Sequence, residues 1–201
     1  PASQPRSIAP TQWHLPRDSV HSALRSAGVS KGRTESIALR LASLGDAEQI
    51  RQIYNYEVSN TTATFDLVPR SLADQQQWIA DRNGAFAAIV AVDPTDELGD
   101  VVGFGSLSPY KERAAYRTSV EDSVYVRRDR NGQGIGKLIV TELVRIAAVS
   151  GFHAVFARIS ASSEASIALH RSCGFDLVGI EREVGRKFNK WLDVALMQAL
   201  L

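Results

Sequence analysis

The sequence predicts an α/β fold in which helices cover a mixed β-sheet. Short apolar segments that alternate like strands interchange with segments whose apolar residues recur at helical spacing, a pattern typical of α/β proteins. The 201 residues are 44% hydrophobic and 22% charged, as in a globular domain, and two full domains would be cramped in this length. A glycine-rich loop between a predicted strand and a predicted helix adds a third observation.

The first 36 residues differ from the rest of the chain. They are rich in Ser, Ala and Pro and carry a net charge of +3, whereas the remainder carries −2. We expect an N-terminal extension over residues 1–36, with at most one short helix near 18–27, and one domain over 37–201. An arm that packs on the domain or on a second subunit is favoured over an organellar transit peptide, because Asp18 and the scattered prolines fit such a peptide poorly.

The first half of the domain is predicted to contain four strands and two helices. Alternating apolar residues place strands at 37–41, 86–92, 101–107 and 118–126. Asp46 is a candidate N-cap for the first helix, and Ser71 begins the second, which stops at Asn83. The Asp-Pro-Thr-Asp segment at 93–96 predicts a hairpin between the second and third strands.

The second half begins with the strongest predicted helix of the chain. One face of this helix carries Ile135, Leu138, Ile139, Leu143, Ile146 and Ala147. Residues 154–159 then form an apolar strand, 163–172 a helix, and 175–183 and 191–200 two closing strands. The predicted order is therefore β-α-α-β-β-β-α-β-α-β-β around a mixed sheet.

The composition argues against several classes of function. A net charge of +1 gives no general polyanion-binding surface, so we expect no nucleic-acid partner. The single cysteine, Cys173, excludes an intrachain disulfide and a cysteine-based zinc site, and it indicates a reducing, cytoplasmic location. No apolar run approaches the roughly 20 residues that span a bilayer, so no membrane partner is expected. We expect no bound metal either.

The segment VYVRRDRNGQGIGKL, residues 124–138, is the most informative part of the sequence. Its glycines lie between a strand and a helix, where a turn presents unpaired backbone N–H groups and a positive helix end to an anion. The spacing fits neither a Walker loop, since only three residues separate Gly132 from Gly136, nor a dinucleotide fingerprint, since Ile139 holds the third glycine position. Anion binding is favoured over a turn that only caps a core helix.

Gly-Gln-Gly-Ile-Gly in this position resembles the pyrophosphate loop of the GNAT acetyltransferases. The family pattern Gln/Arg-x-x-Gly-x-Gly/Ala maps to residues 131–136, where Asn131 departs from the pattern and Gly134 and Gly136 match it. The resemblance implies the GNAT fold, with acetyl-CoA as cosubstrate and no metal. The acetyl-CoA-binding residues that it implies are Val124, Tyr125, Val126, Asn131, Gly132, Gln133, Gly134, Ile135, Gly136, Lys137, Ser163 and Ser166.

Further motifs resemble the phosphinothricin N-acetyltransferase subgroup of this family. They are IYNY at 53–56, NTTATFD at 60–66, YRTSVEDSVYV at 116–126, ASIALH at 165–170, GF at 174–175 and GRKFNKWLD at 185–193. Ser163 departs from the Asn that is common in the subgroup. The resemblance implies a homodimeric enzyme that acetylates the amine of a small amino-acid-like substrate directly. A polyamine, drug or protein amine as acceptor, and a non-catalytic acyl-CoA sensor, remain alternatives.

Glu121 and His170 are the candidate catalytic residues. Strand alternation places Glu121 on the face opposite Val120 and Val124, and its match to the subgroup motif favours a proton acceptor over a salt-bridged strand acid. His170 stands where many GNAT enzymes carry a Tyr that protonates the departing thiolate, and an imidazole serves as base or as proton donor near neutral pH. We expect the two to cooperate, with the order of proton transfer left open.

The segment just before Glu121 combines cations with aromatic residues. A small amino acid or its phosphinic analogue needs its anions neutralised while its amine faces the base. The candidate substrate-binding residues are Phe65, Lys111, Arg113, Tyr116 and Arg117. Solvated loop charges and core packing of the aromatic rings are the alternatives.

Overall fold

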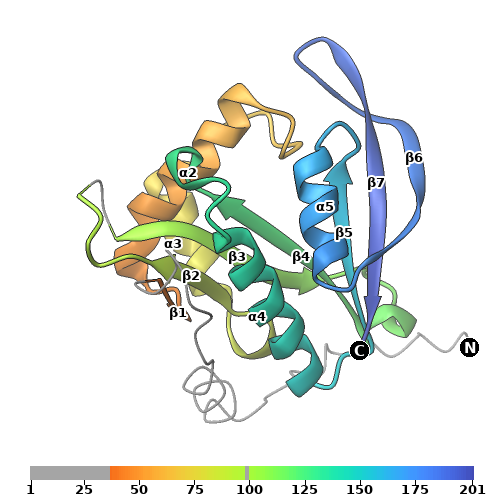
Figure 1. Ribbon diagram of the computed structural model, residues 1–201, viewed down its shortest axis with the longest axis horizontal. Helices are drawn as coiled ribbons and strands as arrows, with labels where there is room; N and C mark the ends of the chain where they lie inside the picture. Colours follow the sequence, from red (N-terminus) through yellow and green to blue (C-terminus); the bar gives the residue numbers. More distant parts are fainter. Residues whose placement is uncertain (1–36, 98–99) are drawn as a thin grey trace, which may run out of the picture.

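A seven-stranded mixed sheet runs through the computed structural model, which describes residues 37–97 and 100–201. The strands are β1 (Ala38–Leu41), β2 (Ala88–Val92), β3 (Val101–Pro109), β4 (Ser119–Val126), β5 (Ala154–Ser160), β6 (Asp176–Lys187) and β7 (Lys190–Leu200). Their spatial order is β1-β2-β3-β4-β5-β7-β6, and only the β4–β5 pair is parallel (Figure 1). The extension predicted for residues 1–36 lies outside the described residues.

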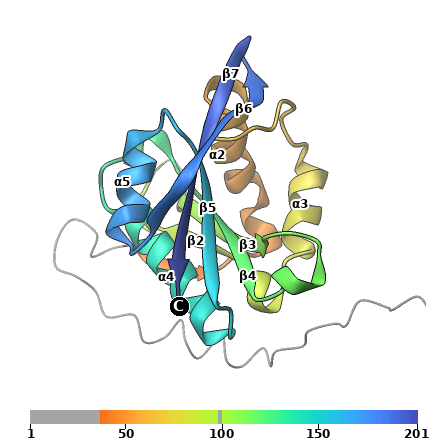
Figure 2. The same cartoon turned by 90° about the vertical axis from the view of Figure 1, so that its right-hand side faces the viewer.

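Two helices cover each face of the sheet. Helices α2 (Ala47–Asn60) and α3 (Leu72–Ala80) lie on one side, and α4 (Ile135–Val149) and α5 (Glu164–Ser172) on the other (Figure 2). The α/β class and the order of elements are confirmed, and the boundaries agree to within a few residues. No helix in the described ranges is long and apolar enough to cross a membrane.

The predicted helix starts are only partly correct. Ser71 caps α3 as expected, because its hydroxyl accepts from the Asp74 amide at 3.1 Å. Asp46 does precede α2, but its carboxylate does not cap that helix. It binds instead to Arg40 and to the backbone N–H of Ser43, each at 2.7 Å, and so braces the turn that leads into α2.

The core fixes the position of α4 on the sheet. Ile139, Leu143 and Ile146 of α4 are almost fully buried against a cluster that includes Val102 and Val155. Complete burial of each such side chain contributes roughly 1.5–3 kcal/mol. The N-terminus of α4 is therefore held at the C-terminal end of β4, where the sequence predicts an anion-binding turn.

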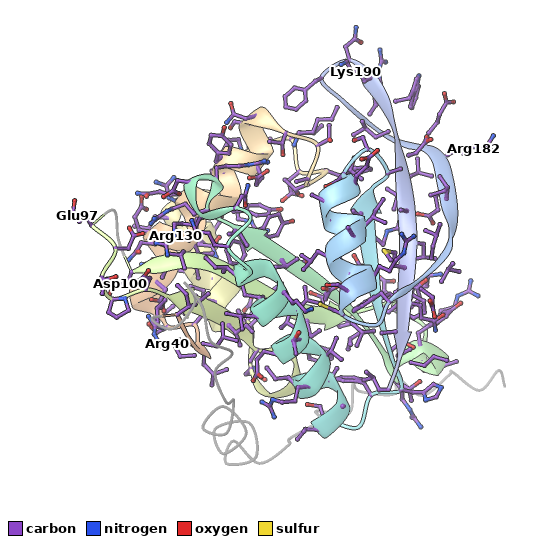
Figure 3. All side chains as sticks on the ribbon, in the orientation of Figure 1. Arg40, Glu97, Asp100, Arg130, Arg182 and Lys190 are labelled. Atoms are coloured by element: carbon purple, nitrogen blue, oxygen red, sulfur yellow. The ribbon has the colours of Figure 1, made fainter. Side chains whose placement is uncertain are left out.

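Strand β6 is an edge strand with an apolar surface. The β6–β7 hairpin extends beyond the rest of the sheet, with Lys190 at its tip and Arg182 pointing away from the molecule (Figures 1 and 3). Large apolar side chains along β6 and its hairpin are 46–60% exposed, and they are Leu177, Val178, Ile180, Val184, Phe188 and Trp191. These six residues are called the apolar stripe on β6 and its hairpin.

Candidate active site

Strands β4 and β5 pair over only three residues and then part. Residues 119–121 lie opposite 154–156, whereas β4 continues to Val126 and β5 to Ser160. Beyond Glu121, the β4 backbone groups that face away from β3 have no strand partner in the described part of the chain. A cavity of about 650 Å³ opens there, lined by both strands. An unpaired strand edge of this kind binds an extended ligand through backbone hydrogen bonds.

Two glycines shape the turn at one end of this cavity. Gly134 is the N-cap of α4 and has φ +82°, a left-handed conformation that strains other residues. Gly136 lies so close to α5 that a Cβ would come within 3.0 Å of Leu169. The first turn of α4 lines the cavity, and its unpaired N–H groups and the positive helix end favour an anion.

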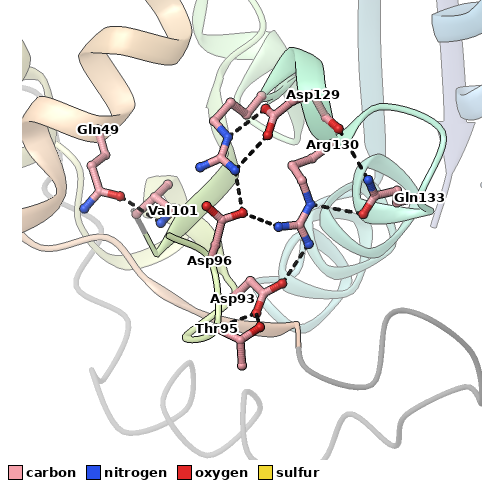
Figure 4. Close-up of polar contacts among 9 residues, drawn as sticks. Gln49, Asp93, Thr95, Asp96, Val101, Asp129, Arg130 and Gln133 are labelled. Carbon is pink, nitrogen blue, oxygen red and sulfur yellow. Dashed lines mark hydrogen bonds and ion pairs between the residues drawn. The ribbon is translucent and has the colours of Figure 1, made fainter. Parts of the chain in front are cut away.

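Two acids of the β2–β3 hairpin hold the arginines that precede the glycine turn (Figure 4). Arg130 donates to Asp93 at 2.7 Å, to Asp96, and through Nε to Gln133 at 3.0 Å. Arg127 donates to the same Asp96 carboxylate at 2.5 Å. The Arg130 guanidinium and the Thr95 hydroxyl and amide hold the pKa of Asp93 well below its usual range. These ion pairs restrain the backbone on which the glycine turn is built.

A second set of contacts joins the turn to α2 and β6. Arg128 donates to Glu57 of α2 through Nε at 2.8 Å and Nη2 at 2.5 Å, and both residues line the cavity. Lys187 of β6 is only 4% exposed and donates to the carbonyls of Glu57 at 3.4 Å and Thr64 at 2.8 Å. Burial lowers the pKa of Lys187. The cavity wall is thus cross-linked by charged groups from three elements.

Glu121 lies where the two strands part, as the last β4 residue paired with β5. Its side chain is half-buried in the cavity wall, and no residue of the described ranges donates a hydrogen bond to its carboxylate. Burial raises the pKa of Glu121; the positive charge of Arg158 opposes this rise, and the acids Asp122 and Glu181 add to it. A carboxylate with a raised pKa and an open hydrogen-bonding position is suited to accept a proton.

His170 of α5 forms a buried pair with Asp122. Its Nδ1 lies 2.8 Å from the carbonyl of Ser166, which only accepts, so Nδ1 carries a proton. Its Nε2 lies 3.2 Å from Asp122 Oδ2, and His170 is 2% exposed. Burial lowers the pKa of His170, but the hydrogen bond and charge of Asp122, with the Ser166 carbonyl, more than offset this, so the net pKa is raised. Both ring nitrogens are therefore occupied.

Glu121 and His170 approach the cavity from opposite faces of β4. Asp122, the partner of His170, shares its strand face with the buried Val120, whereas Glu121 faces the other way. Both Glu121 and His170 line the cavity. The structure thus brings the two candidate catalytic residues to one cavity but on different sides of the strand.

The loop predicted to bind substrate lies beside the cavity and does not line it. Tyr110 stacks on Phe156, the register partner of Glu121, with ring centroids 3.9 Å apart. Tyr116 makes an edge contact with Tyr110 at 5.8 Å, and Lys111 Nζ lies 4.8 and 5.1 Å from the two rings. The loop residues outside the lining are Lys111, Arg113, Tyr116 and Arg117.

The structure brings most of the other predicted residues together. The cavity is lined by Phe65, Glu121, Val124, Tyr125, Val126, Asn131, Gly132, Gly134, Ile135, Gly136, Lys137, Ser163, Ser166 and His170. Gln133 is the exception, because its side chain turns toward Arg130 and the Asp129 carbonyl. The ring of Phe65 lies against Gly185 of β6, where a Cβ would collide with it.

The sequence interpretation missed several functional candidates. Asp122 carried a usable signal, because an acid between Val120 and Val124 on a buried strand face requires a buried partner. Arg158 lines the cavity on β5, and Glu57 holds the glycine turn from α2; neither has a distinctive local pattern.

The cavity combines an anion-binding end with a proton-accepting end. The glycine turn favours phosphate, the open edge of β4 favours an extended chain, and Glu121 lies at the other end of that edge. This arrangement is suited to moving a group from a phosphate-containing donor to a protonated nucleophile. No group of three or more His, Cys, Asp or Glu residues that would hold a metal occurs within the described ranges.

A family profile for the acetyltransferase (GNAT) domain matches residues 39–196. The chain belongs to the GNAT acetyltransferase family. This acetyltransferase is 38% identical over 164 residues to an L-methionine sulfoximine/L-methionine sulfone acetyltransferase from Pseudomonas aeruginosa, which covers 81% of this chain and 94% of the relative. It is 36% identical to a phosphinothricin N-acetyltransferase from Streptomyces coelicolor, with 81% and 95% covered. A GNAT superfamily phosphinothricin acetyltransferase from Sinorhizobium meliloti, crystallised with acetyl-CoA, matches at TM-score 0.77 and 38% identity, over 83% of this chain and 89% of that one.

The buried His170–Asp122 pair predicts a pH-dependent contribution to the stability of this acetyltransferase. Because the pKa of His170 is raised in the fold, the pair stabilises fully below the unfolded pKa of about 6.5 and loses its contribution as the pH rises through the folded pKa. We expect Asp122→Asn to lower the free energy of unfolding by about 1–3 kcal/mol near pH 6, and by less near pH 9. Urea unfolding across this range measures the difference.

Asp176→Asn, which changes an exposed acid at the start of β6, is the matched control and should show little change at either pH. A loss for Asp122→Asn that is equal at both pH values would contradict the assigned proton on His170.

Proposed function

We propose that this enzyme transfers the acetyl group of acetyl-CoA directly to the amine of a small amino-acid-like acceptor, of the phosphinothricin or methionine sulfoximine type. The observation that carries the proposal is the open edge of β4, which runs from the glycine turn to Glu121. The activities named for the Pseudomonas and Streptomyces relatives support this acceptor class. A cytoplasmic location fits the single cysteine, which has no partner for a disulfide within the chain.

The donor site fits acetyl-CoA in shape and in charge. Apart from the adjacent residues in the chain, no heavy atom of the described residues lies within 4 Å of the place that a Cβ at Gly132 or Gly134 would occupy, so the turn is open to a pyrophosphate. The lack of a β5 partner for residues 124–126 supports the proposal that their backbone groups hydrogen-bond the pantetheine arm like an added strand. Ser163 and Ser166 line the same cavity, and we propose that they contact that arm.

Phosphate binding in this chain relies on backbone groups. Asn131 stands where the family has Gln or Arg, and Arg128 and Arg130 are engaged with acids of the protein. The N–H groups of the glycine turn and the first turn of α4, with Lys137, remain as the anion-binding groups. The exact course of the turn backbone therefore determines donor affinity.

In the proposed reaction, Glu121 accepts the proton of the acceptor amine. Its carboxylate is open, half-buried and raised in pKa, as a base at this position requires. His170 holds its proton more firmly than an ordinary histidine because Asp122 stabilises the charged form. It therefore fits the role of proton donor to the departing thiolate better than that of base, and such a transfer requires Nε2 to leave its hydrogen bond with Asp122.

The acceptor is proposed to bind on the Glu121 face of the sheet. Phe65 supplies one wall, and the aromatic cluster of Tyr110, Tyr116 and Phe156 lies on the other side of Glu121. The cations of this loop, Lys111, Arg113 and Arg117, are proposed to neutralise an anionic side chain such as a phosphinate.

Glu121→Gln should reduce kcat/KM for acetyl transfer by about 10²–10⁴-fold, since it removes the base, and should leave acetyl-CoA affinity unchanged. In the wild type, kcat/KM should rise with pH through a pKa above the usual Glu value of about 4.3, because burial raises the pKa of Glu121. This rise of kcat/KM with pH should be absent in Glu121→Gln.

A thiol-release assay against a panel of amino acids, sulfoximines and polyamines measures the rates, and calorimetry measures acetyl-CoA binding. Full activity in Glu121→Gln would refute its role as base. Activity confined to polyamines would refute the proposed acceptor class.

Asp93→Asn should weaken acetyl-CoA binding by about 5–10-fold, because loss of the charged partner of Arg130 loosens the turn that binds phosphate. Calorimetric titration with acetyl-CoA gives the dissociation constant. Glu97→Gln, an exposed acid on the same hairpin (Figure 3), is the matched control. If Asp93→Asn bound acetyl-CoA as tightly as the control Glu97→Gln, the hairpin acids would have no influence on the donor site.

We also propose that the enzyme is a homodimer that uses the apolar stripe on β6 and its hairpin. An edge strand with half-exposed Ile180, Val184 and Trp191 leaves unpaired backbone groups and apolar surface in water, and a second copy would cover both.

Equilibrium sedimentation at micromolar concentration should give twice the chain mass of 21.9 kDa. Ile180→Lys should shift the equilibrium toward monomer, because it places a charge in the stripe, whereas Arg182→Gln on the same strand should not. A wild type that sediments as a monomer would refute the dimer.

A further inference from the structure

Among the cations that line the cavity, Arg158 is the one that lies on the same face of the sheet as Glu121. Along β5, Val155, Ala157 and Ile159 belong to the core beneath α4, so Phe156, Arg158 and Ser160 face the other side. The cations that line the cavity in the described ranges are Arg128, Arg130, Lys137 and Arg158. The first three belong to the glycine turn and the start of α4, at the donor end.

The register places Arg158 close to the candidate base. Glu121 lies opposite Phe156, and Arg158 is two residues further along β5 on the same face. For strands about 4.8 Å apart at the last pair and a rise of about 3.3 Å per residue, this corresponds to a Cα separation of at least roughly 8 Å, because the strands part beyond that pair. Two long side chains at that separation bracket a gap that fits an amine and a carboxylate on one carbon atom. Burial raises the pKa of Glu121 and the charge of Arg158 opposes that rise, so the two groups interact.

Arg158 already binds a carboxylate in this structure. Its Nη2 lies 2.7 Å from Glu181 Oε2, and its Nη1 donates to Oε1 at 3.3 Å. Both side chains are about one-third exposed, at 35% and 36%. Ion pairs at this exposure contribute little to stability, so another carboxylate can compete with Glu181 for Arg158. The guanidinium fork suits an incoming carboxylate as well as it suits Glu181.

We propose that Arg158 binds the α-carboxylate of the acceptor in place of Glu181 and thereby directs the α-amine to Glu121. This inference rests on the proposed function and narrows it to α-amino acids with a free carboxylate. Polyamines and simple drug amines lack the group that Arg158 recognises. Because Arg158 binds the carboxylate in this proposal, the loop before β4 contacts the side chain of the acceptor.

The test compares an acid with its amide in wild type and in Arg158→Gln. The probes are L-methionine sulfoximine and its carboxamide, which present the same amine with and without the negative charge. We expect Arg158→Gln to raise the KM for the acid by about 10–100-fold with little change in kcat, and to change the KM for the amide less than about twofold. The KM for acetyl-CoA should not change.

Two further variants make the test specific. Glu181→Gln should lower the KM for the acid a few-fold, because it removes the internal competitor for Arg158. Arg182→Gln, at an exposed neighbouring position on β6 (Figure 3), should leave every parameter unchanged. Equilibrium binding of the acid and the amide to the CoA-loaded protein gives a second readout that does not depend on turnover.

The outcomes separate this inference from the proposed function. Equal loss for acid and amide in Arg158→Gln, or equal binding of both by the wild type, would overturn the role of Arg158 while leaving acetyl transfer intact. Turnover of no amine, together with unselective binding, would overturn both. Charge-selective binding that disappears in Arg158→Gln supports the inference even where turnover is slow.

Discussion

The early parting of β4 from β5 is the constraint on which the rest of this structure depends. Unpaired backbone groups inside a protein are costly, so two adjacent parallel strands separate only where other contacts hold them apart. Here α4 and α5 pack on one side of the opening, and the Asp122–His170 pair ties α5 to β4 at its edge. The opening leaves the end of β4 available to a ligand, and it places Glu121 at the point where pairing stops.

Ion pairs hold the part of the cavity wall that apolar packing does not fix, which is the turn before α4. The core fixes α4 strongly but leaves the turn before it without apolar anchors, and the charged contacts of Arg127, Arg128 and Arg130 supply the missing restraint. Such pairs add little net stability when desolvation is counted, but they have one geometry in which all partners are satisfied. Their contribution here is to the position of the turn backbone, on which any phosphate contact depends.

The fold was largely predictable from local sequence, and the site only in part. The α4 helix and the glycine turn were found because periodicity and glycine spacing are local signals. The parting of the strands could not be found, because it depends on pairing between segments more than 30 residues apart. The arginines Arg128 and Arg130 precede the predicted anion-binding turn, yet their acid partners lie on a distant hairpin and on α2. Arg158 was missed for the same reason, since its value comes from its register opposite the Glu121 region and not from its neighbours in sequence.

In the proposed reaction, the two faces of β4 carry different proton-transfer groups. A donor chain that lies along the open edge of β4 passes between them, with Glu121 on one face and the Asp122–His170 pair on the other. An acceptor amine held by Arg158 then meets the thioester from the Glu121 side, while the proton-bearing imidazole remains on the helix side. Separating base and acid by the strand prevents them from neutralising each other through a direct hydrogen bond. Asp122 can therefore raise the pKa of His170 against the opposing effect of burial, while Glu121 keeps its carboxylate open to the amine.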